Sequence, residues 1–334
     1  QTHLRCLGAE LSAQALDEMA RPVGVSRTME AWLNACFGET LTKRFFGPFH
    51  DLYTAGLHDR IAPQDGYKSP VNLGLAVKGA LTDVPAVGYN TTFLYPSNGL
   101  DELSRRMAAD CDVQYGRRVA AIDTQARQLR CDDGSTEDYR SVLSTLPLNV
   151  AMDMAELKLA APADPHTSVL VLNIGATKGP RCPDDHWLYI PFSDSGFHRV
   201  GFYSNVDESF LPKPGAQGVA PAQRVSIYIE RAYVGGTRPT PAEVEAYQRA
   251  VTSELKRWDY IIEDEVVHPT WIDVAYTWSW PDSRWPQQAM AALEPHGVYQ
   301  IGRYGRWIFQ GIADSIRDGF IAGSSWAGSR RDAK

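Results

Sequence analysis

The segment that most constrains the fold lies near the C-terminus, where an apolar strand, a crossing that contains glycines and a helix follow one another. Its sequence is YQIGRYGRW over residues 299–307, and GIADSI follows over residues 311–316. The glycines let a ligand approach the backbone closely, and the amides that open a helix can hold an anionic or electron-rich ligand atom. On spacing alone, the segment is either such a ligand-binding crossing or an ordinary strand-to-helix turn.

The rest of the chain alternates between helical and strand-rich stretches, which predicts a mixed α/β fold. An aromatic-rich helical region is expected over residues 10–60, with Val23 on the apolar face of its first helix. Further helices are expected over 101–109, with Asp101 as the N-cap, over 241–262 and over 312–322. A strand and a turn are expected over 91–100, and strands over 142–145, 169–174, 186–191, 199–204, 224–233, 274–278 and 297–301. Asp133-Gly134 predicts a hairpin turn.

Composition places the chain among globular proteins and excludes several classes. Hydrophobic residues make up 44% and charged residues 22% of the 334 residues, close to the globular average. The formal net charge of -7 argues against nucleic acid as the main partner, because phosphate binding needs clustered lysine and arginine. No apolar run is long enough to predict a membrane span.

The five cysteines and eight histidines form no pattern that is typical of a metal site. The cysteines are widely spaced and include no C-x-x-C pair, so zinc is not expected. The histidines include no H-E-x-x-H, and the chain has no G-x-S-x-G of a serine hydrolase. Scattered free thiols suit a reducing compartment, so we expect a cytoplasmic protein.

Several short motifs follow one another in an order that is found in one family of flavoproteins. Besides the C-terminal segment they are FLYP at 93–96 with Gly99, DG at 133–134, STLP at 144–147, HWLYIP at 186–191, FHRV at 197–200 and SN at 204–205. Together they resemble the UDP-galactopyranose mutase group of the FAD-dependent amine oxidase and protoporphyrinogen oxidase-like superfamily. The resemblance spans nearly the whole chain.

The resemblance implies an α/β fold with α+β insertions, built from a mixed-sheet FAD-binding domain, a helical insertion and a sheet-rich substrate domain. Residues 1–90 would form a mainly helical substrate or cap region, 91–165 part of the FAD-binding domain, 166–290 the substrate domain and 291–330 the C-terminal FAD-binding segment. It also implies an enzyme with FAD that isomerises a nucleotide sugar between pyranose and furanose forms. N5 of the reduced flavin would be the nucleophile, and no catalytic side chain is assigned.

The same resemblance assigns residues to the two ligands. For the nucleotide sugar, Arg199 would hold the diphosphate, Asn205 would lie nearby, Tyr53 and Trp32 would stack on the base, and Phe309 would replace a tyrosine of the prokaryotic mutases. For FAD, the backbone of Val119 would meet the adenine, and the C-terminal segment would supply Gly302, Arg303, Gly305, Trp307, Gly311, Ile312 and Ala313. The alternatives are a surface cation for Arg199 and a structural ion pair for Arg303.

Two departures from the family pattern leave alternatives open. The chain has no G-x-G-x-x-G and begins at Gln1. We therefore expect that the dinucleotide-binding segment precedes this chain; otherwise it lies on a separate chain, or FAD is not bound. Phe309 lacks the hydroxyl that would bind a phosphate. The alternative functions are an FAD-dependent oxidoreductase acting on a small molecule, and a non-catalytic subunit that pairs with a separate Rossmann chain.

Overall fold

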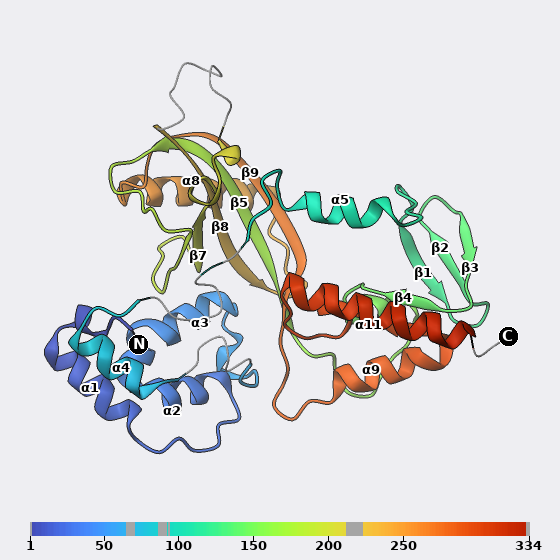
Figure 1. The fold of residues 1–334 in the computed structure, drawn as a ribbon, viewed down its shortest axis with the longest axis horizontal. Helices are drawn as coiled ribbons and strands as arrows, with labels where there is room; N and C mark the ends of the chain where they lie inside the picture. Colours follow the sequence, from blue (N-terminus) through green and yellow to red (C-terminus); the bar gives the residue numbers. More distant parts are fainter. Residues whose placement is uncertain (1, 65–70, 86–91, 93, 212–222, 332–334) are drawn as a thin grey trace. The chain divides into compact units, whose positions relative to one another are not determined.

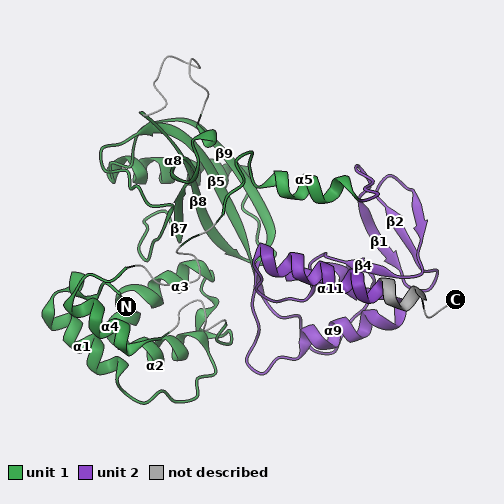
Figure 2. Cartoon of the chain, viewed as in Figure 1, with its two compact units in different colours: residues 1–110, 167–275 green, residues 111–166, 276–334 purple. Residues whose placement is uncertain are grey.

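The computed structural model describes residues 2–64, 71–85, 92, 94–211 and 223–331. Phe93 of the FLYP motif lies outside the described residues. The chain divides into two compact units, the first with residues 1–110 and 167–275 and the second with residues 111–166 and 276–334 (Figure 2). The assignment of segments to FAD-binding and substrate domains stays a prediction.

The N-terminal part of the first unit is helical, as predicted (Figure 1). Its elements are η1 (Leu4–Leu7), α1 (Ala9–Met19), α2 (Met29–Leu41), the π-helical η2 (Thr42–Phe46), α3 (Gly47–Tyr53), η3 (Leu57–Asp59), α4 (Leu73–Leu81) and α5 (Asp101–Ala109). Helix α2 kinks at Gly38, which has a φ of 77° and no room for a side chain beside Glu18. The Glu18 carboxylate accepts hydrogen bonds from the Thr40 amide at 2.7 Å and hydroxyl at 2.9 Å, which joins α1 to α2.

The rest of the first unit is a five-stranded sheet with the strand order β6-β7-β8-β5-β9. The strands are β5 (His166–Lys178), β6 (Trp187–Tyr189), β7 (Arg199–Phe202), β8 (Arg224–Val234) and β9 (Ile261–Thr277), with α7 (Tyr203–Val206) and η4 (Glu208–Phe210) after β7. Alternate residues of β5, β7 and β8, such as Leu172, Phe202 and Ile229, form a core with Leu255 of α8 (Pro241–Arg257). Because side chains alternate along a strand, the residues between them face away from α8.

The second unit combines two small sheets with helices. Strands β1 (Val119–Asp123), β2 (Gln128–Cys131) and β3 (Thr136–Asp138) are antiparallel, and Asp133-Gly134 lies in the turn between β2 and β3, as predicted. Strands β4 (Val142–Ser144) and β10 (Val298–Gln300) pair in parallel. The helices are α6 (Leu148–Met154), α9 (Trp285–Leu293), η6 (Glu294–His296), α10 (Gly302–Gly305) and α11 (Ile312–Arg331). The mixed α/β fold class is confirmed.

The largest boundary error concerns α8 and β9. Helix α8 starts where predicted, with Thr240 accepting a hydrogen bond from the Glu243 amide, but it ends at Arg257 instead of residue 262. The helix stops because Asp259 takes a left-handed φ of 60°, after which the chain enters β9 at Ile261. Only the end of β9 was expected as a strand, because most of its residues lie on the exposed edge of the sheet and show no clear alternation.

Smaller errors affect three helix ends and one expected strand. Val23 lies beyond the end of α1 and is 53% exposed, and Asp101 is the first residue of α5, whose N-cap is Leu100. Helix α11 continues to Arg331. The described residues of 91–100 form no strand, because they contain turns at Ser97-Asn98 and no neighbouring strand pairs with them.

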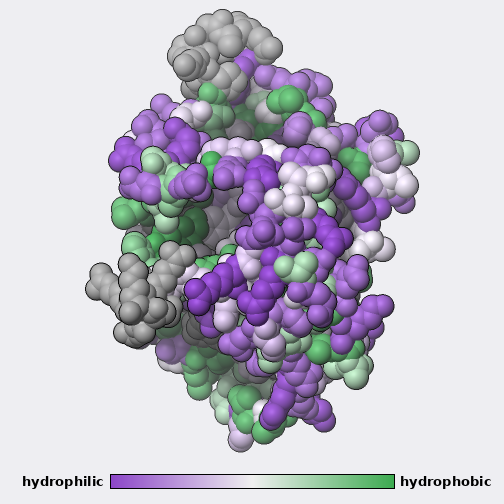
Figure 3. Space-filling model, turned by 90° about the vertical axis from the view of Figure 1, so that its right-hand side faces the viewer, coloured by the Kyte–Doolittle hydropathy of each residue, from purple (hydrophilic) through white to green (hydrophobic). Residues whose placement is uncertain are grey.

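The exposed surface is predominantly polar on the face that Figure 3 draws, where hydrophobic side chains form small, separate patches. In the part of the chain that the structure describes, no helix is both long enough and apolar enough to cross a membrane.

Candidate functional site

The predicted ligand-binding crossing follows the parallel pair β4–β10 in the second unit. The Ile301 amide donates to the Ser144 carbonyl at 2.9 Å, which joins the end of β10 to the STLP turn. Gly302 has a φ of 73°, and a side chain there would meet no heavy atom within 4 Å. Gly305 instead packs so closely that a Cβ would lie 3.1 Å from the Ser144 carbonyl oxygen. The two glycines therefore differ in their surroundings. Gly302 borders open space, and Gly305 allows the backbone to pack closely against Ser144.

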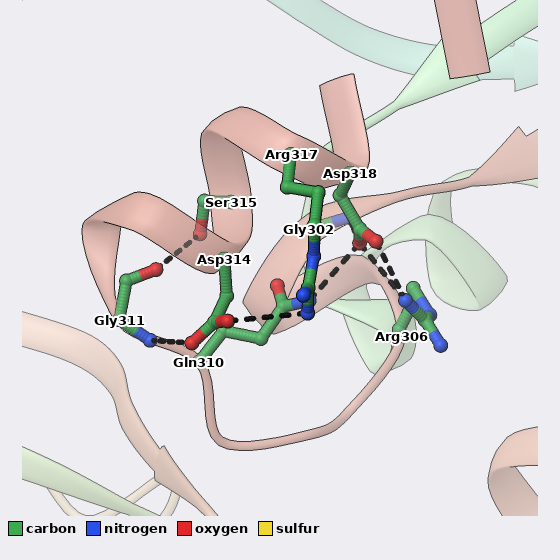
Figure 4. A network of polar contacts seen from close by, with 8 residues as sticks. All are labelled: Gly302, Arg306, Gln310, Gly311, Asp314, Ser315, Arg317 and Asp318. Carbon is green, nitrogen blue, oxygen red and sulfur yellow. Dashed lines mark hydrogen bonds and ion pairs between the residues drawn. The ribbon is translucent and has the colours of Figure 1, made fainter. Parts of the chain in front are cut away.

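Helix α11 begins with an exposed turn that suits an electron-rich ligand. Gly311 precedes the helix, and its amide donates to the Asp314 carboxylate at 3.2 Å (Figure 4). The first amides of a helix have no hydrogen-bond partner inside the helix. Gly311, the residue before α11, has no side chain that could accept hydrogen bonds from these amides. The amides that follow Gly311 are thus presented at the positive end of a long helix, where Ile312 and Ala313 were predicted to meet the cofactor.

Asp318 of α11 joins the two ends of the crossing. Its carboxylate accepts hydrogen bonds from the Gly302 amide at 3.3 Å, from Arg306 Nη1 at 2.8 and 3.0 Å, and from Gln310 Nε2 at 3.1 Å (Figure 4). Burial alone would raise the pKa of Asp318, but the hydrogen bonds from Gln310 and Arg306 outweigh it and lower the pKa. Sequence reasoning missed this residue, because nothing in the local pattern links position 318 to position 302.

Arg303 lies among aromatic rings. Its guanidinium carbon is 5.6 Å from the ring centroid of Tyr276, 5.4 Å from that of Tyr304 and 4.5 Å from that of Phe309. One of its nitrogens, Nη1, donates to the Gln310 carbonyl at 3.2 Å. The rings and this hydrogen bond fix the direction of a delocalised cation, as is expected of an arginine that contacts a planar ligand.

Trp307 is a core residue with an unusual backbone. It is 3% exposed, its φ is 57°, and its indole N–H donates to the Trp278 carbonyl at 2.9 Å. Its ring packs edge-on against Trp285, with centroids 5.2 Å apart. A left-handed conformation is rare for a residue with a Cβ, and it persists only where the surroundings enforce it. The structure therefore assigns Trp307 a supporting position, and its predicted contact with FAD stays a prediction.

In the first unit, Arg199 lies on the face of the sheet that is turned away from α8. It pairs with Glu230 across β7 and β8, and the two side chains form an ion pair. The Arg199 guanidinium carbon is 5.4 Å from the ring centroid of Tyr228. His198 is 1% exposed, and its Nε2 is 3.4 Å from the second Glu230 oxygen. The Glu230 carboxylate is 11% exposed, so the charge of Arg199 is balanced by a largely buried partner.

Aromatic side chains of α3 and β6 adjoin this ion pair. The rings of Phe49 and Tyr53 are stacked with centroids 5.5 Å apart, and Tyr53 lies 5.2 Å from the His198 ring. Phe49 also contacts Tyr189, which pairs with Arg199 across β6 and β7. The structure thus links two predicted substrate residues through a chain of contacts: Tyr53 packs against His198, and His198 and Arg199 both lie beside Glu230.

Three further predicted residues make contacts of their own within the fold. Asn205 Nδ2 donates to the carbonyls of Pro183 and Asp185 at 2.9 and 2.8 Å. Trp32 of α2 makes an edge contact with Phe37, at 6.1 Å between centroids. Val119 begins β1 and is half-buried. In the described part of the chain, no group of three or more His, Cys, Asp or Glu residues could hold a metal ion.

Sequence reasoning also missed Glu254, which holds the turn before Arg199. Glu254 is 1% exposed and accepts hydrogen bonds from the Asp194 amide at 2.9 Å, the Ser195 amide at 2.8 Å and the Ser193 hydroxyl at 3.1 Å. A signal was present: the residue lies beside Val251 and Leu255 on the apolar face of α8. A carboxylate in such a position needs several donors, since burying it without them is costly.

Replacing Gly201 with alanine should displace the Tyr228 ring, over which the Arg199 guanidinium lies. Gly201 pairs with Tyr228 across β7 and β8, and a Cβ at position 201 would overlap the Tyr228 ring. Because overpacking a fitted site is destabilising, we expect the free energy of unfolding to fall by about 1–3 kcal/mol. Urea denaturation would measure this. Gly319→Ala is the matched control, because position 319 is open and helical; an equal loss there would contradict the explanation.

The Glu230 carboxylate should make stability depend on pH. Burial alone would raise its pKa, but the hydrogen bond from His198 and the charge of Arg199 lower the pKa to about 2 from an ordinary 4.5. A carboxyl whose pKa is lowered on folding stabilises the protein above its ordinary pKa, and this contribution is lost as the pH falls. The stability advantage of the wild type over Glu230→Gln, measured by urea denaturation, should therefore shrink as the pH falls from 4.5 towards 2. A pH-independent difference would contradict this.

Comparisons with known proteins agree with one another on the fold. A family model described as flavin containing amine oxidoreductase matches residues 5–330. Reduced UDP-galactopyranose mutase is similar with a TM-score of 0.76 and 19% identity, over 92% of this chain and 70% of its own. A protein from Exiguobacterium assigned as a protoporphyrinogen oxidase has a TM-score of 0.57 and 14% identity, over 88% of this chain and 67% of its own. Putrescine oxidase has a TM-score of 0.53 and 14% identity, over 97% of this chain and 74% of its own. No curated protein matches significantly.

Proposed function

Because the chain belongs to the flavin-containing amine oxidoreductase family, we propose that it is an FAD-dependent enzyme that isomerises a nucleotide sugar between pyranose and furanose forms. The structural likeness to UDP-galactopyranose mutase supports the choice of reaction within this family. The observation that carries the proposal is the position of Arg199, a cation that is paired with Glu230 and lies over the Tyr228 ring, while the Tyr53 ring packs against the adjoining His198. A diphosphate needs such a cation, and a nucleotide base needs a flat ring on which to stack.

The residues of the second unit fit a flavin. Gly302 leaves an open space that a Cβ would fill, and α11 presents its first amides nearby in the sequence. The side-chain nitrogen and oxygen of Gln300, at the end of β10, are buried and have no hydrogen-bond partner among the described residues, as expected beside a ligand site. Gly302, Arg303, Gly305, Gly311, Ile312 and Ala313 would hold FAD, with Val119 towards its adenine. The reduced flavin supplies a nucleophilic nitrogen for the exchange at the sugar carbon.

The chain's own residues would bind and orient the nucleotide sugar. Arg199 would hold the diphosphate, and Glu230 would fix the plane of its guanidinium. Tyr53 would stack on the base, with Trp32 as a second ring. The Asn205 amide nitrogen is engaged by two carbonyls, so its side-chain oxygen would be the group that meets the sugar nucleotide.

The test is a conversion assay on protein loaded with FAD. UDP-galactofuranose is incubated with the loaded protein, with and without dithionite, and the products are separated chromatographically. We expect UDP-galactopyranose to form only when the flavin is reduced. If a reduced protein with bound FAD forms none, the mutase proposal fails.

Phe309 favours a second candidate, an FAD-dependent oxidoreductase acting on a small molecule. Its ring lies 4.5 Å from the guanidinium carbon of Arg303, and it has no hydroxyl to donate to a phosphate. Amine oxidation would be recognised by bleaching of the flavin absorbance when an amine such as putrescine is added without oxygen. Bleaching by an amine, together with no conversion of the sugar nucleotide, would replace the first proposal with this one.

The β4–β10 pair favours a third candidate, a subunit completed by a separate chain. Parallel sheets usually contain more than two strands and are covered on both faces, whereas Leu143 of β4 is 39% and Tyr299 of β10 is 37% exposed. A chain with a dinucleotide-binding strand would extend this pair. Stoichiometric binding of FAD by the present chain alone would exclude the need for such a partner.

A further inference from the structure

The segment between β10 and α11 has a backbone that needs support from outside it. It starts at Gly302 and reaches Gly311, and both Gly302 and Trp307 take left-handed φ values, 73° and 57°. Glycine adopts such a conformation readily, but Trp307 has a Cβ and keeps it only because neighbouring groups enforce it. A flexible segment would also lose more conformational entropy when it orders around a ligand, and this lowers the affinity.

Asp318 provides support from the adjoining helix. Its carboxylate touches the start of the segment at the Gly302 amide, the middle at Arg306 and the end at the Gln310 side chain (Figure 4). The Asp318 side chain is only 18% exposed, and the adjacent charge is the guanidinium of Arg306. One carboxylate thus holds three points of a ten-residue crossing, and its charge is compensated by a residue of that crossing.

The direction of the Gly302 peptide follows from this contact. Its amide points to Asp318 at 3.3 Å, while the position of a Cβ on the same residue meets nothing within 4 Å. A ligand can therefore approach Gly302 at its Cα, from the direction in which a side chain would point. A rotation of this peptide would bring the amide or the carbonyl into the open space instead.

We propose that Asp318 is a positioning residue for the flavin. Its carboxylate holds the segment Gly302–Gly311 in the conformation that receives the cofactor. The proposal rests on the flavin cofactor of the family and on no property of the substrate. A negative conversion assay with a sugar nucleotide therefore leaves it standing.

The test compares the FAD affinity of Asp318→Asn with that of the wild type, by titration of the flavin fluorescence. Asparagine is nearly isosteric but has no charge and turns an NH₂ group towards one of the donors. We expect the dissociation constant for FAD to rise at least tenfold, with an unchanged far-ultraviolet circular dichroism spectrum. The visible spectrum of the remaining bound flavin should also shift, because the segment around it is no longer fixed.

Arg317→Ala is the matched control. Arg317 lies next to Asp318 on α11, is 73% exposed and pairs with Asp314 at 3.3 Å, so we expect a change of less than twofold in the dissociation constant. If Asp318→Asn does not fold, Arg306→Met is judged by the same tenfold criterion, because it removes the cation that holds the carboxylate. Three results would overturn the proposal. The Asp318→Asn protein could bind FAD as tightly as the wild type, Arg317→Ala could weaken FAD binding as much as Asp318→Asn does, or the wild type could bind no FAD.

Discussion

Arg199→Ala should destabilise the first unit by about 3–5 kcal/mol, because it leaves a buried charge without its partner. The Glu230 carboxylate is 11% exposed, and Arg199 is the cation that pairs with it across β7 and β8. The variant should also bind UDP more weakly, since a lost charge-assisted hydrogen bond costs about 1.5–3 kcal/mol. Urea denaturation and calorimetric titration with UDP would measure the two effects separately.

The double variant Arg199→Met with Glu230→Gln separates these two roles of Arg199. It removes both charges at once, so no buried carboxylate stays unpaired, and most of the stability should return. The affinity for UDP should stay low, because the cation is still missing. If the double variant binds UDP as tightly as the wild type, Arg199 is a structural residue and our assignment of the diphosphate is wrong.

Glu254→Ala should lower the free energy of unfolding by about 3 kcal/mol. It leaves two backbone amides and a hydroxyl in the turn Ser193–Ser195 without their acceptor, and each unsatisfied buried group costs about 1–3 kcal/mol. We take the lower part of the summed range, because the freed turn can reach water. The turn leads directly into His198 and Arg199, so the affinity for UDP should fall as well.

Two variants check the explanation for Glu254. Glu245→Ala, on an exposed position of the same helix, should change the free energy of unfolding by less than about 0.5 kcal/mol. Glu254→Gln keeps an acceptor oxygen, so its free energy of unfolding should fall less than that of the alanine variant. Equal losses at positions 245 and 254 would mean that helix propensity, and not the turn, explains the result.

Features encoded within a few residues of one another could be predicted from the sequence. The start of α8 follows from Thr240, Pro241 and Glu243, which form a capping box. The turn at Asp133-Gly134 and the crossing at Gly302 follow from glycine's access to positive φ values. In each case the residues that determine the structure are neighbours in the chain.

The rest depended on pairings between distant residues. Glu230 meets Arg199 because β7 and β8 pair in one particular register, and no local pattern reveals that register for two residues 31 positions apart. Strand β9 was mostly missed because an edge strand with exposed residues lacks the alternation of a half-buried strand. Asp318 lies inside a helix whose sequence says nothing about the segment that it supports.

We infer that this chain carries a flavin on the segment between β10 and α11. The most direct measurement is the visible absorbance of the full-length protein after incubation with excess FAD and separation from the free cofactor by gel filtration. We expect a flavin spectrum to elute with the protein in stoichiometric amount. A protein peak without flavin absorbance would contradict it.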